Sequence, residues 1–138
     1  MAIMAEVRVE RTDDGGFFAT NARGARVEIG SSDQDGVFSP VELLLVALGG
    51  CEIVTVEPLT AKRGHRLVKL AVRVDAEKVE TSKIGPVTAT YEIELPPGDD
   101  KAAEVFEAVA HRVHEGYCTV GRALREPTDT IQILPPRP

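Results

Sequence analysis

The chain contains two cysteines, Cys51 and Cys118, each within a stretch of small residues. Cys51 follows Gly49 and Gly50 in the most apolar part of the chain, and Cys118 begins the sequence CTVGRAL. A thiolate is a nucleophile that oxidises readily, whereas a buried protonated cysteine is an inert small hydrophobe. Each glycine costs a helix about 1 kcal/mol, which indicates that another element or a small substrate approaches the backbone here. Composition alone favours the inert interpretation, with Cys51 filling a gap in the core.

The composition is that of a globular protein. The 138 residues suit one domain that needs neither a disulfide nor a metal. A formal charge of −6 argues against a broad nucleic-acid-binding surface and favours a small molecule as substrate or ligand. The start of the chain lacks a basic segment followed by an apolar core, so we expect a cytoplasmic protein with reduced thiols. We expect no membrane span, because Glu42, Glu52 and Glu57 interrupt the best apolar run.

Short strands precede the Cys51 segment. Apolar and polar residues alternate in residues 5–12, and two further strand-like pieces occupy residues 17–20 and 25–30. DDGG at 13–16 and NARG at 21–24 are turn sequences that separate them. This pattern predicts an N-terminal antiparallel meander, followed by a loop.

The Cys51 segment is predicted to be a helix. Ser39, Pro40 and Glu42 form the capping-box pattern that starts helices. Residues 43–48 are apolar on nearly all sides, so we expect this helix to be enclosed by protein. Pro58 predicts a kink or break near residues 54–57, and Gly64 predicts the end of the helix.

The remaining pattern predicts two long antiparallel strands, at residues 67–79 and 85–95, and an amphipathic helix over 101–117 that ends near Gly116. A short helix over 118–124 and a last strand over 129–134 follow. The sum is an α+β fold in a single domain, residues 1–138, without repeats or linkers.

At SPVELLLVALGGC, followed 67 residues after Cys51 by the cysteine of YCTVGRALR, the chain resembles the OsmC/Ohr superfamily, the osmotically inducible and organic hydroperoxide resistance proteins. The resemblance covers nearly the whole chain. It implies antiparallel sheets around a long, buried, kinked helix, and two chains intertwined in a homodimer with active sites at the subunit interface. The apolar face of helix 40–57 independently favours a dimer, because one small chain cannot cover it.

The resemblance also implies a chemistry. Cys51 matches a peroxidatic cysteine that reduces an organic hydroperoxide and becomes a sulfenic acid, and Cys118 matches the resolving cysteine that condenses with it. A dithiol reductant, lipoyl-linked in several family members, would restore both thiols, and no metal or organic cofactor is implied. The rival hypothesis is a non-catalytic OsmC-like protein that binds a small hydrophobic molecule at the dimer interface.

A buried thiolate needs a nearby cation. In the family an arginine of the N-terminal meander has this role, and Arg23 matches it, with Arg26 as a second candidate; the alternative is that Arg23 is an exposed turn residue. The hydroperoxide-reducing branch orients this arginine with a glutamate ten residues before the cysteine, a register that Val41 occupies here. Glu42 lies one step on and is a candidate supporting residue, although a rotation of about 100° favours a role as a cap alone. This departure indicates an OsmC-like subgroup whose substrate the sequence does not specify.

Other polar residues near the cysteines have less distinctive patterns. Glu52 and Glu57 flank Cys51; we favour the interpretation that they are solvated at the broken end of the helix, the alternative being that one of them holds the arginine. His111 and His114 precede Cys118 at helical spacing, but a fourth zinc ligand is absent, and exposed helix histidines are commoner. Tyr117 is expected to pack, or to line the pocket.

Overall fold

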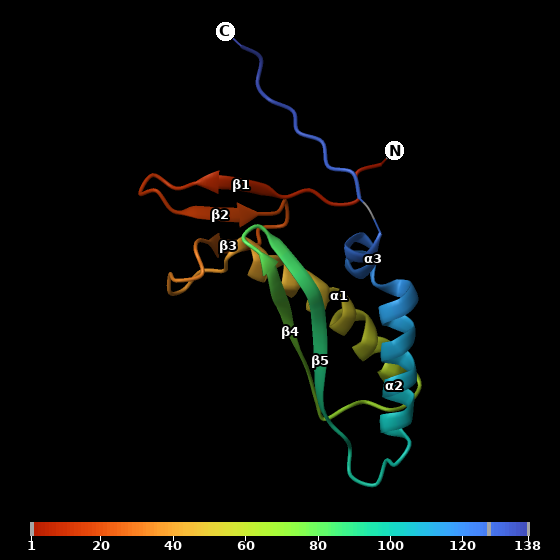
Figure 1. The fold of residues 1–138 in the computed structure, drawn as a ribbon. Coiled ribbons are helices and arrows are strands. Elements are labelled where there is room, and N and C mark those ends of the chain that lie inside the picture. Colours follow the sequence, from red (N-terminus) through yellow and green to blue (C-terminus); the bar gives the residue numbers. More distant parts are fainter. Residues whose placement is uncertain (1, 127, 138) are drawn as a thin grey trace. The chain divides into compact units, whose positions relative to one another are not determined.

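The structure is a computed structural model that describes residues 2–126 and 128–137. Within these residues, two antiparallel sheets and three α-helices confirm the predicted α+β class (Figure 1). The elements are β1 (Arg8–Arg11), β2 (Phe17–Thr20), β3 (Arg26–Ile29), α1 (Pro40–Lys62), β4 (Lys69–Glu80), β5 (Lys83–Glu94), α2 (Ala102–Arg112), the π-helical turn η1 (Val113–Tyr117) and α3 (Thr119–Arg125). The chain divides within α1 into two compact units, Met1–Val46 and Ala47–Pro138, which we describe separately.

The first unit contains the predicted meander, in which β1 pairs with β2 and β2 with β3, all antiparallel. Gly15 and Gly24 adopt φ values of 92° and 94°, a region that favours glycine, and each lies in the turn that the sequence predicts. The Asn21 side chain accepts hydrogen bonds from the backbone N–H groups of Arg23 and Ala25, at 3.0 and 3.1 Å. The glycine and asparagine of NARG thus account for a tight second turn.

Helix α1 begins with the predicted capping box. The Ser39 hydroxyl accepts from the Glu42 N–H at 3.1 Å, and the Glu42 carboxylate accepts from the Ser39 N–H at 2.8 Å. The expected break before Pro58 is not found, because α1 continues to Lys62. Pro58 and Val54 are both exposed, so water can satisfy the Val54 carbonyl that Pro58 leaves without its helical donor. Gly64, with φ 87°, follows the last turn as predicted.

Within this single chain α1 is enclosed along one side only, so the enclosure expected for this helix stays a prediction that depends on a second chain. The buried residues of α1 form one stripe: Leu48, Gly49, Glu52, Val56 and Thr60. Exposed apolar side chains occupy other positions on the helix: Val41, Leu44, Val46 and Val54. By length and composition α1 could cross a membrane despite its glutamates, but this is weak evidence for a span, because core helices of soluble proteins meet the same criterion.

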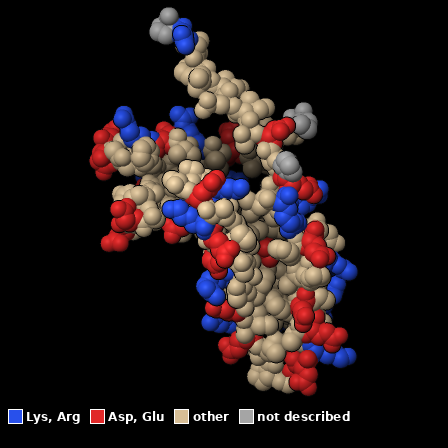
Figure 2. Space-filling model, in the orientation of Figure 1, with Lys and Arg blue, Asp and Glu red and all other residues tan. Residues whose placement is uncertain are grey.

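In the second unit, residues 47–62 of α1 pack against the β4–β5 hairpin and against α2 (Figure 1). The hairpin is antiparallel as predicted, with Val72 opposite Tyr91. The Tyr91 and Phe106 rings meet edge to face, with centroids 5.3 Å apart. The buried core consists of Val56, Leu67, Phe106, Val109 and Val113. Basic and acidic side chains alternate along the visible face of this unit (Figure 2).

The C-terminal part differs from prediction in two places. Helical structure continues past Gly116 to Tyr117, but its last five residues form the π-helical turn η1, and α3 then follows as predicted. The strand predicted over residues 129–134 is absent from the described residues 128–137, which have no regular structure. Ile131 and Ile133 are 86% and 89% exposed. Alternation alone cannot make a strand stable when no neighbouring strand supplies ladder hydrogen bonds.

Candidate functional site

The two cysteines both belong to the second unit and are free thiols. Cys51 lies on α1 and is partly exposed, whereas Cys118 joins η1 to α3 and is completely buried. The Cys118 N–H donates to the Val113 carbonyl at 3.0 Å, which closes the π-helical turn. Its sulfur accepts from the Gly121 N–H at 3.2 Å, so the thiol also caps α3. The local backbone therefore fixes the position of Cys118.

The surroundings of Cys118 keep its thiol protonated. Burial raises the pKa of Cys118, the hydrogen bond from the Gly121 N–H opposes this change, and interactions with Cys51 and Glu52 add to it, so that the pKa rises from 9.0 to about 11. Cys51 and Glu52 are neighbours on α1 and both influence the Cys118 thiol, although the two cysteines are free and not at disulfide distance. At neutral pH Cys118 is a thiol, so any reaction through its sulfur requires the loss of a proton.

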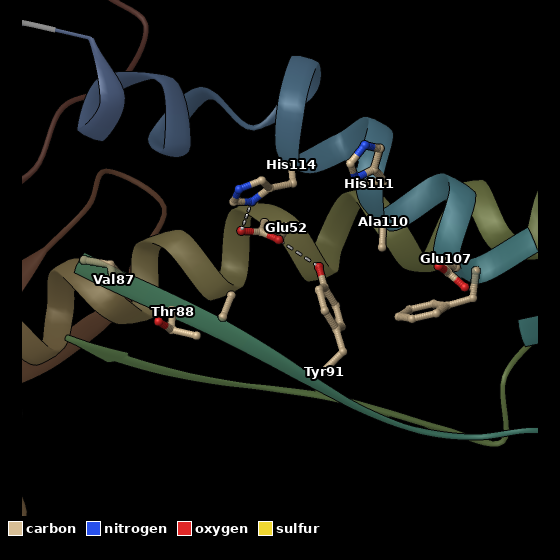
Figure 3. A pocket seen from close by; sticks show the side chains of 10 residues that line it. Glu52, Val87, Thr88, Tyr91, Glu107, Ala110, His111 and His114 are labelled. Atoms are coloured by element: carbon tan, nitrogen blue, oxygen red, sulfur yellow. Dashed lines mark hydrogen bonds and ion pairs between the residues drawn. The ribbon is translucent and has the colours of Figure 1, made fainter. Parts of the chain in front are cut away.

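Glu52 is the most deeply buried charged residue of this site. It is 1% exposed, so the predicted solvated position is wrong. One carboxylate oxygen accepts from the Tyr91 hydroxyl at 3.1 Å, and the other lies 3.3 Å from Nδ1 of His114 (Figure 3). Burial raises the pKa of Tyr91, and the nearby Glu52 charge raises it further. Two partners from β5 and η1 thus compensate the loss of water around the carboxylate.

Two pockets adjoin this cluster. One has a volume of about 440 Å³, and its wall includes Glu52, Tyr91, Phe106 and His114 (Figure 3). The other has a volume of about 400 Å³ and is lined mainly by apolar residues: Leu48, Ile84, Pro86, Val87 and Leu124. His114 borders both pockets, as does Val87. The imidazole therefore faces two spaces that a small molecule could enter.

Gly49 and Gly50 have different surroundings. A Cβ atom on Gly49 would lie 2.9 Å from Cγ2 of Val74, so this glycine allows α1 to touch β4. A Cβ atom on Gly50 would meet nothing within 4 Å in the described chain. The close approach predicted from the glycine pair is confirmed at Gly49, where the approaching element is a strand.

The arginines expected at the site belong to the first unit. Arg23 is exposed in its turn, whereas Arg26 contacts Glu28 at 2.6 Å and lies 3.9 Å from the centre of the Phe18 ring. Glu42 is engaged in the capping box, and its hydrogen bond from the Ser39 backbone lowers its pKa. A role for Arg23 beside Cys51 stays a prediction.

Sequence reasoning missed two residues of the second unit, Tyr91 and Gly121, and it missed the contact that a third, His114, makes with Glu52. Tyr91 and His114 bind Glu52, and a Cβ atom at Gly121 would lie 3.2 Å from both the Cys118 sulfur and Nη1 of Arg125. Tyr91 looked like an ordinary strand residue, and its distance from Glu52 in the chain gave no signal. The four-residue spacing between His114 and Cys118 was visible, but it was considered only as zinc-site spacing.

Other candidates have ordinary roles. His111 pairs with Glu115 at 3.2 Å on the surface, and Glu57 lies 3.9 Å from Nε of Arg66. Tyr117 is 57% exposed, so the prediction that it packs is wrong; it lines a shallow surface pocket. Within residues 2–126 and 128–137, no three His, Cys, Asp or Glu side chains are grouped closely enough to hold a metal.

Comparison with known proteins gives consistent similarities. The model of the family described as OsmC-like protein matches residues 31–132. An uncharacterised protein of Mycobacterium tuberculosis is 33% identical over 129 residues, which cover 91% of this chain and 92% of that protein. The crystal structure of an OsmC-like protein from Mycoplasma pneumoniae is similar at 16% identity, covering 92% of this chain and 91% of that one, with a TM-score of 0.68. The organic hydroperoxide resistance protein OhrB of Bacillus subtilis is similar at 22% identity, covering 92% and 94%, with a TM-score of 0.56.

Proposed function

This chain belongs to the OsmC-like protein family, and from that membership we propose that it is a thiol peroxidase that reduces organic hydroperoxides in oxidative stress defence. Cys51 is the peroxidatic residue and Cys118 the resolving residue. The observation that carries this proposal is that two free thiols, a partly exposed Cys51 and a buried Cys118, belong to the same compact unit. The name of a structural neighbour, organic hydroperoxide resistance protein, agrees with the same chemistry.

The proposed cycle begins at Cys51. Its thiolate attacks the terminal oxygen of the hydroperoxide, the O–O bond breaks, and the alkoxide takes a proton and leaves as an alcohol. Cys51 is then a sulfenic acid. The sulfur of Cys118 displaces hydroxide from it, giving a disulfide and water, and a dithiol reductant, lipoyl-linked in several family members, returns both thiols by exchange.

The thiolate requires a cation, and Arg23 is our proposed source. Arg23 is exposed and matches the family position, while Arg26 already contacts Glu28 and Phe18. Arg125, which lies near Gly121 and Cys118, is the rival source of the cation in the second unit. Arg23→Gln should slow oxidation of Cys51 by at least tenfold, whereas Arg26→Gln should leave it nearly unchanged. A large loss in Arg125→Gln alone would transfer the role to Arg125.

We propose a homodimer as the working form, in the cytoplasm and without membrane or nucleic-acid partners. Exposed apolar side chains on α1 support association, since a large apolar patch on a surface usually marks an interface. Light scattering should give twice the chain mass of 14.9 kDa at micromolar concentration. Val54→Asp, which places a charge where Val54 is 69% exposed, should shift the mass toward the monomer if this face is the interface.

The central test follows hydroperoxide consumption. Reduced protein is mixed with cumene hydroperoxide and a dithiol, and turnover is compared among wild type, Cys51→Ser and Cys118→Ser. Turnover should disappear in Cys51→Ser, while Cys118→Ser should still be oxidised once and then recycle slowly. Wild-type turnover no faster than that of Cys51→Ser would refute the peroxidase proposal.

A non-catalytic binding protein is the second candidate, and the apolar pocket of about 400 Å³ supports it. Leu48 and Leu124 are among its walls, so a small hydrophobic molecule would be its ligand. Quenching of an environment-sensitive apolar dye, unchanged by Cys51→Ser and lost in Leu124→Asp, would favour binding if hydroperoxide turnover is absent.

A further inference from the structure

Resolution by Cys118 faces a protonation problem, because the sulfur that must attack is a completely buried thiol. Burial favours the neutral form, which is a poor nucleophile. The proton of Cys118 must leave as its sulfur attacks Cys51, and the departing hydroxide must gain one. A base beside Cys118 would therefore accelerate closure of the disulfide, a step that rests on the proposed function.

We propose that Glu52 and His114 form the proton-transfer pair for this step, with His114 as the proton acceptor and Glu52 as its positioning residue. The carboxylate of Glu52 lies 3.3 Å from Nδ1 of His114 and is 1% exposed, while the His114 side chain is 52% exposed. One end of the pair is thus buried, as Cys118 is, and the other reaches solvent.

The contact with Glu52 determines which nitrogen of the His114 ring carries the proton. A carboxylate at Nδ1 favours the tautomer that carries its proton there, which leaves Nε2 as the basic nitrogen. Tyr91 donates to the other carboxylate oxygen at 3.1 Å and so holds Glu52 in place. When the imidazole gains a second proton at Nε2, its Nδ1 keeps the contact with the Glu52 carboxylate, which holds the ring in place. The arrangement combines a base with a group that orients it.

The position of His114 relative to Cys118 is set by η1. His114 lies in the π-helical turn that Cys118 closes, and it borders the pocket that Gly121 also lines. The Gly121 N–H bonds the Cys118 sulfur, and Glu52 is close enough to raise the pKa of that thiol. π-helical turns occur often at functional sites. The base, its partner and the thiol therefore share one neighbourhood.

Other titratable groups of the second unit face the same region and bear on its pH dependence. They come from α1, β5, α2 and α3: Cys51, Tyr91, Glu107, His111 and Arg125. Tyr91 keeps its proton at neutral pH, because burial raises its pKa. His111 is paired with Glu115 and is 74% exposed, which makes it a matched control on the same stretch of helix.

The step balances without an added reactant. His114 takes the proton from Cys118, the Cys118 sulfur bonds to the sulfur of Cys51 sulfenic acid, and the S–O bond breaks. The leaving hydroxide takes a proton from protonated His114 and departs as water. His114 returns to its starting state, and the two cysteines end as a disulfide.

The test separates formation of the sulfenic acid from its resolution. Reduced protein receives one equivalent of cumene hydroperoxide, and quenched samples are analysed by mass spectrometry for sulfenic acid trapped with dimedone and for disulfide. His114→Gln should form sulfenic acid at the wild-type rate but close the disulfide about 100-fold more slowly, the scale of general base catalysis. His111→Gln should match wild type in both steps.

The pH profile distinguishes a base from a structural residue. Wild-type closure should rise with pH and level off once His114 is neutral, whereas closure in His114→Gln should continue to rise about tenfold per pH unit into the alkaline range. Imidazole added to His114→Ala should restore part of the rate. Glu52→Gln, a second variant in case the histidine variants misfold, should also slow closure. Equal closure rates in wild type, His114→Gln and Glu52→Gln across pH 6 to 9 would overturn the inference.

A second oxidant separates this inference from the peroxidase proposal. Diamide adds to the Cys51 thiolate, and Cys118 then displaces a hydrazine to give the same disulfide, so this closure also needs loss of the Cys118 proton. Dependence on His114 with diamide, in a protein that does not consume hydroperoxide, would support the proton-transfer pair and refute the peroxidase. Hydroperoxide turnover in which disulfide closure does not depend on His114 under either oxidant would support the peroxidase proposal and refute the proton-transfer pair.

Discussion

The carboxylate of Glu52 lies 3.3 Å from Nδ1 of His114, and Glu52 directly follows Cys51 on α1. A fully buried carboxylate is costly unless it is hydrogen-bonded, and here both oxygens have partners. The stability of the fold and the proposed chemistry thus depend on the same contacts. Unfolding and reaction rates can both be measured on the same variants.

Removing the hydroxyl of Tyr91 should destabilise the fold. Tyr91→Phe keeps the edge-to-face contact with Phe106 but leaves one oxygen of buried Glu52 without its donor, at a cost of about 1–3 kcal/mol in the free energy of unfolding. Urea unfolding measures this loss. The chain has two tyrosines, and Tyr117→Phe, at a side chain 57% exposed, is the control that should change little. Equal stability of the two variants would contradict the described hydrogen bond.

The two glycines before Cys51 should respond oppositely to alanine. Gly49→Ala places a Cβ atom 2.9 Å from Cγ2 of Val74 and should cost about 1–3 kcal/mol through overpacking. Gly50→Ala meets nothing within 4 Å and should stabilise the helix by about 0.5–1 kcal/mol. Thermal unfolding of both variants checks the difference. Destabilisation by Gly50→Ala would indicate that another molecule, such as a second chain, approaches at this point.

Alkaline pH should reduce stability through Cys118. Its pKa is about 11 in the folded chain and 9.0 ordinarily, so the unfolded state ionises first as pH rises. The contribution of the protonated thiol is therefore complete below pH 9 and is lost as pH rises from there through about 11. Unfolding of reduced wild type should weaken more over this interval than unfolding of Cys118→Ala. Parallel pH curves for the two proteins would argue against a buried neutral thiol.

The pair His65 and Asp99 should affect stability at the acid end. The two side chains lie 2.7 Å apart, and the hydrogen bond from His65 lowers the pKa of Asp99 below its ordinary 3.8. A lowered carboxyl pKa stabilises the fold above 3.8, and that contribution is lost as pH falls through the lower folded value. Asp99→Asn should therefore lose less stability below about pH 4 than wild type. Asp100→Asn, at the exposed neighbour, is the control and should follow wild type.

Local patterns in the sequence predicted most of the fold. The capping box at Ser39 and Glu42, the turns with Gly15 and Gly24, and the β4–β5 hairpin depend on neighbouring residues, so their signals lie within short windows. The strand expected over 129–134 failed because strand formation depends on a partner that a single pattern does not reveal.

The site was predictable only in part, for a related reason. The cysteines could be identified by spacing and family resemblance, but the partners of Glu52 are 39 and 62 residues away in the chain. Only the packing of α1 against both the hairpin and the α2–η1 segment brings Tyr91 and His114 to it. The solvated interpretation of Glu52 followed the expected break at Pro58, and the continuous helix removed its basis.

The position of Cys118 relative to Cys51 depends on the number of residues in the π-helical turn Val113–Tyr117. A wide turn accommodates one more residue than an α-helix, so deleting Gly116 would restore α-helical periodicity and rotate everything after it by about 100°. Such a deletion would keep both cysteines in the sequence while turning Cys118 away from Cys51. Among descendants of this protein, insertions and deletions in that turn would thus separate the two sulfurs more readily than most amino-acid substitutions.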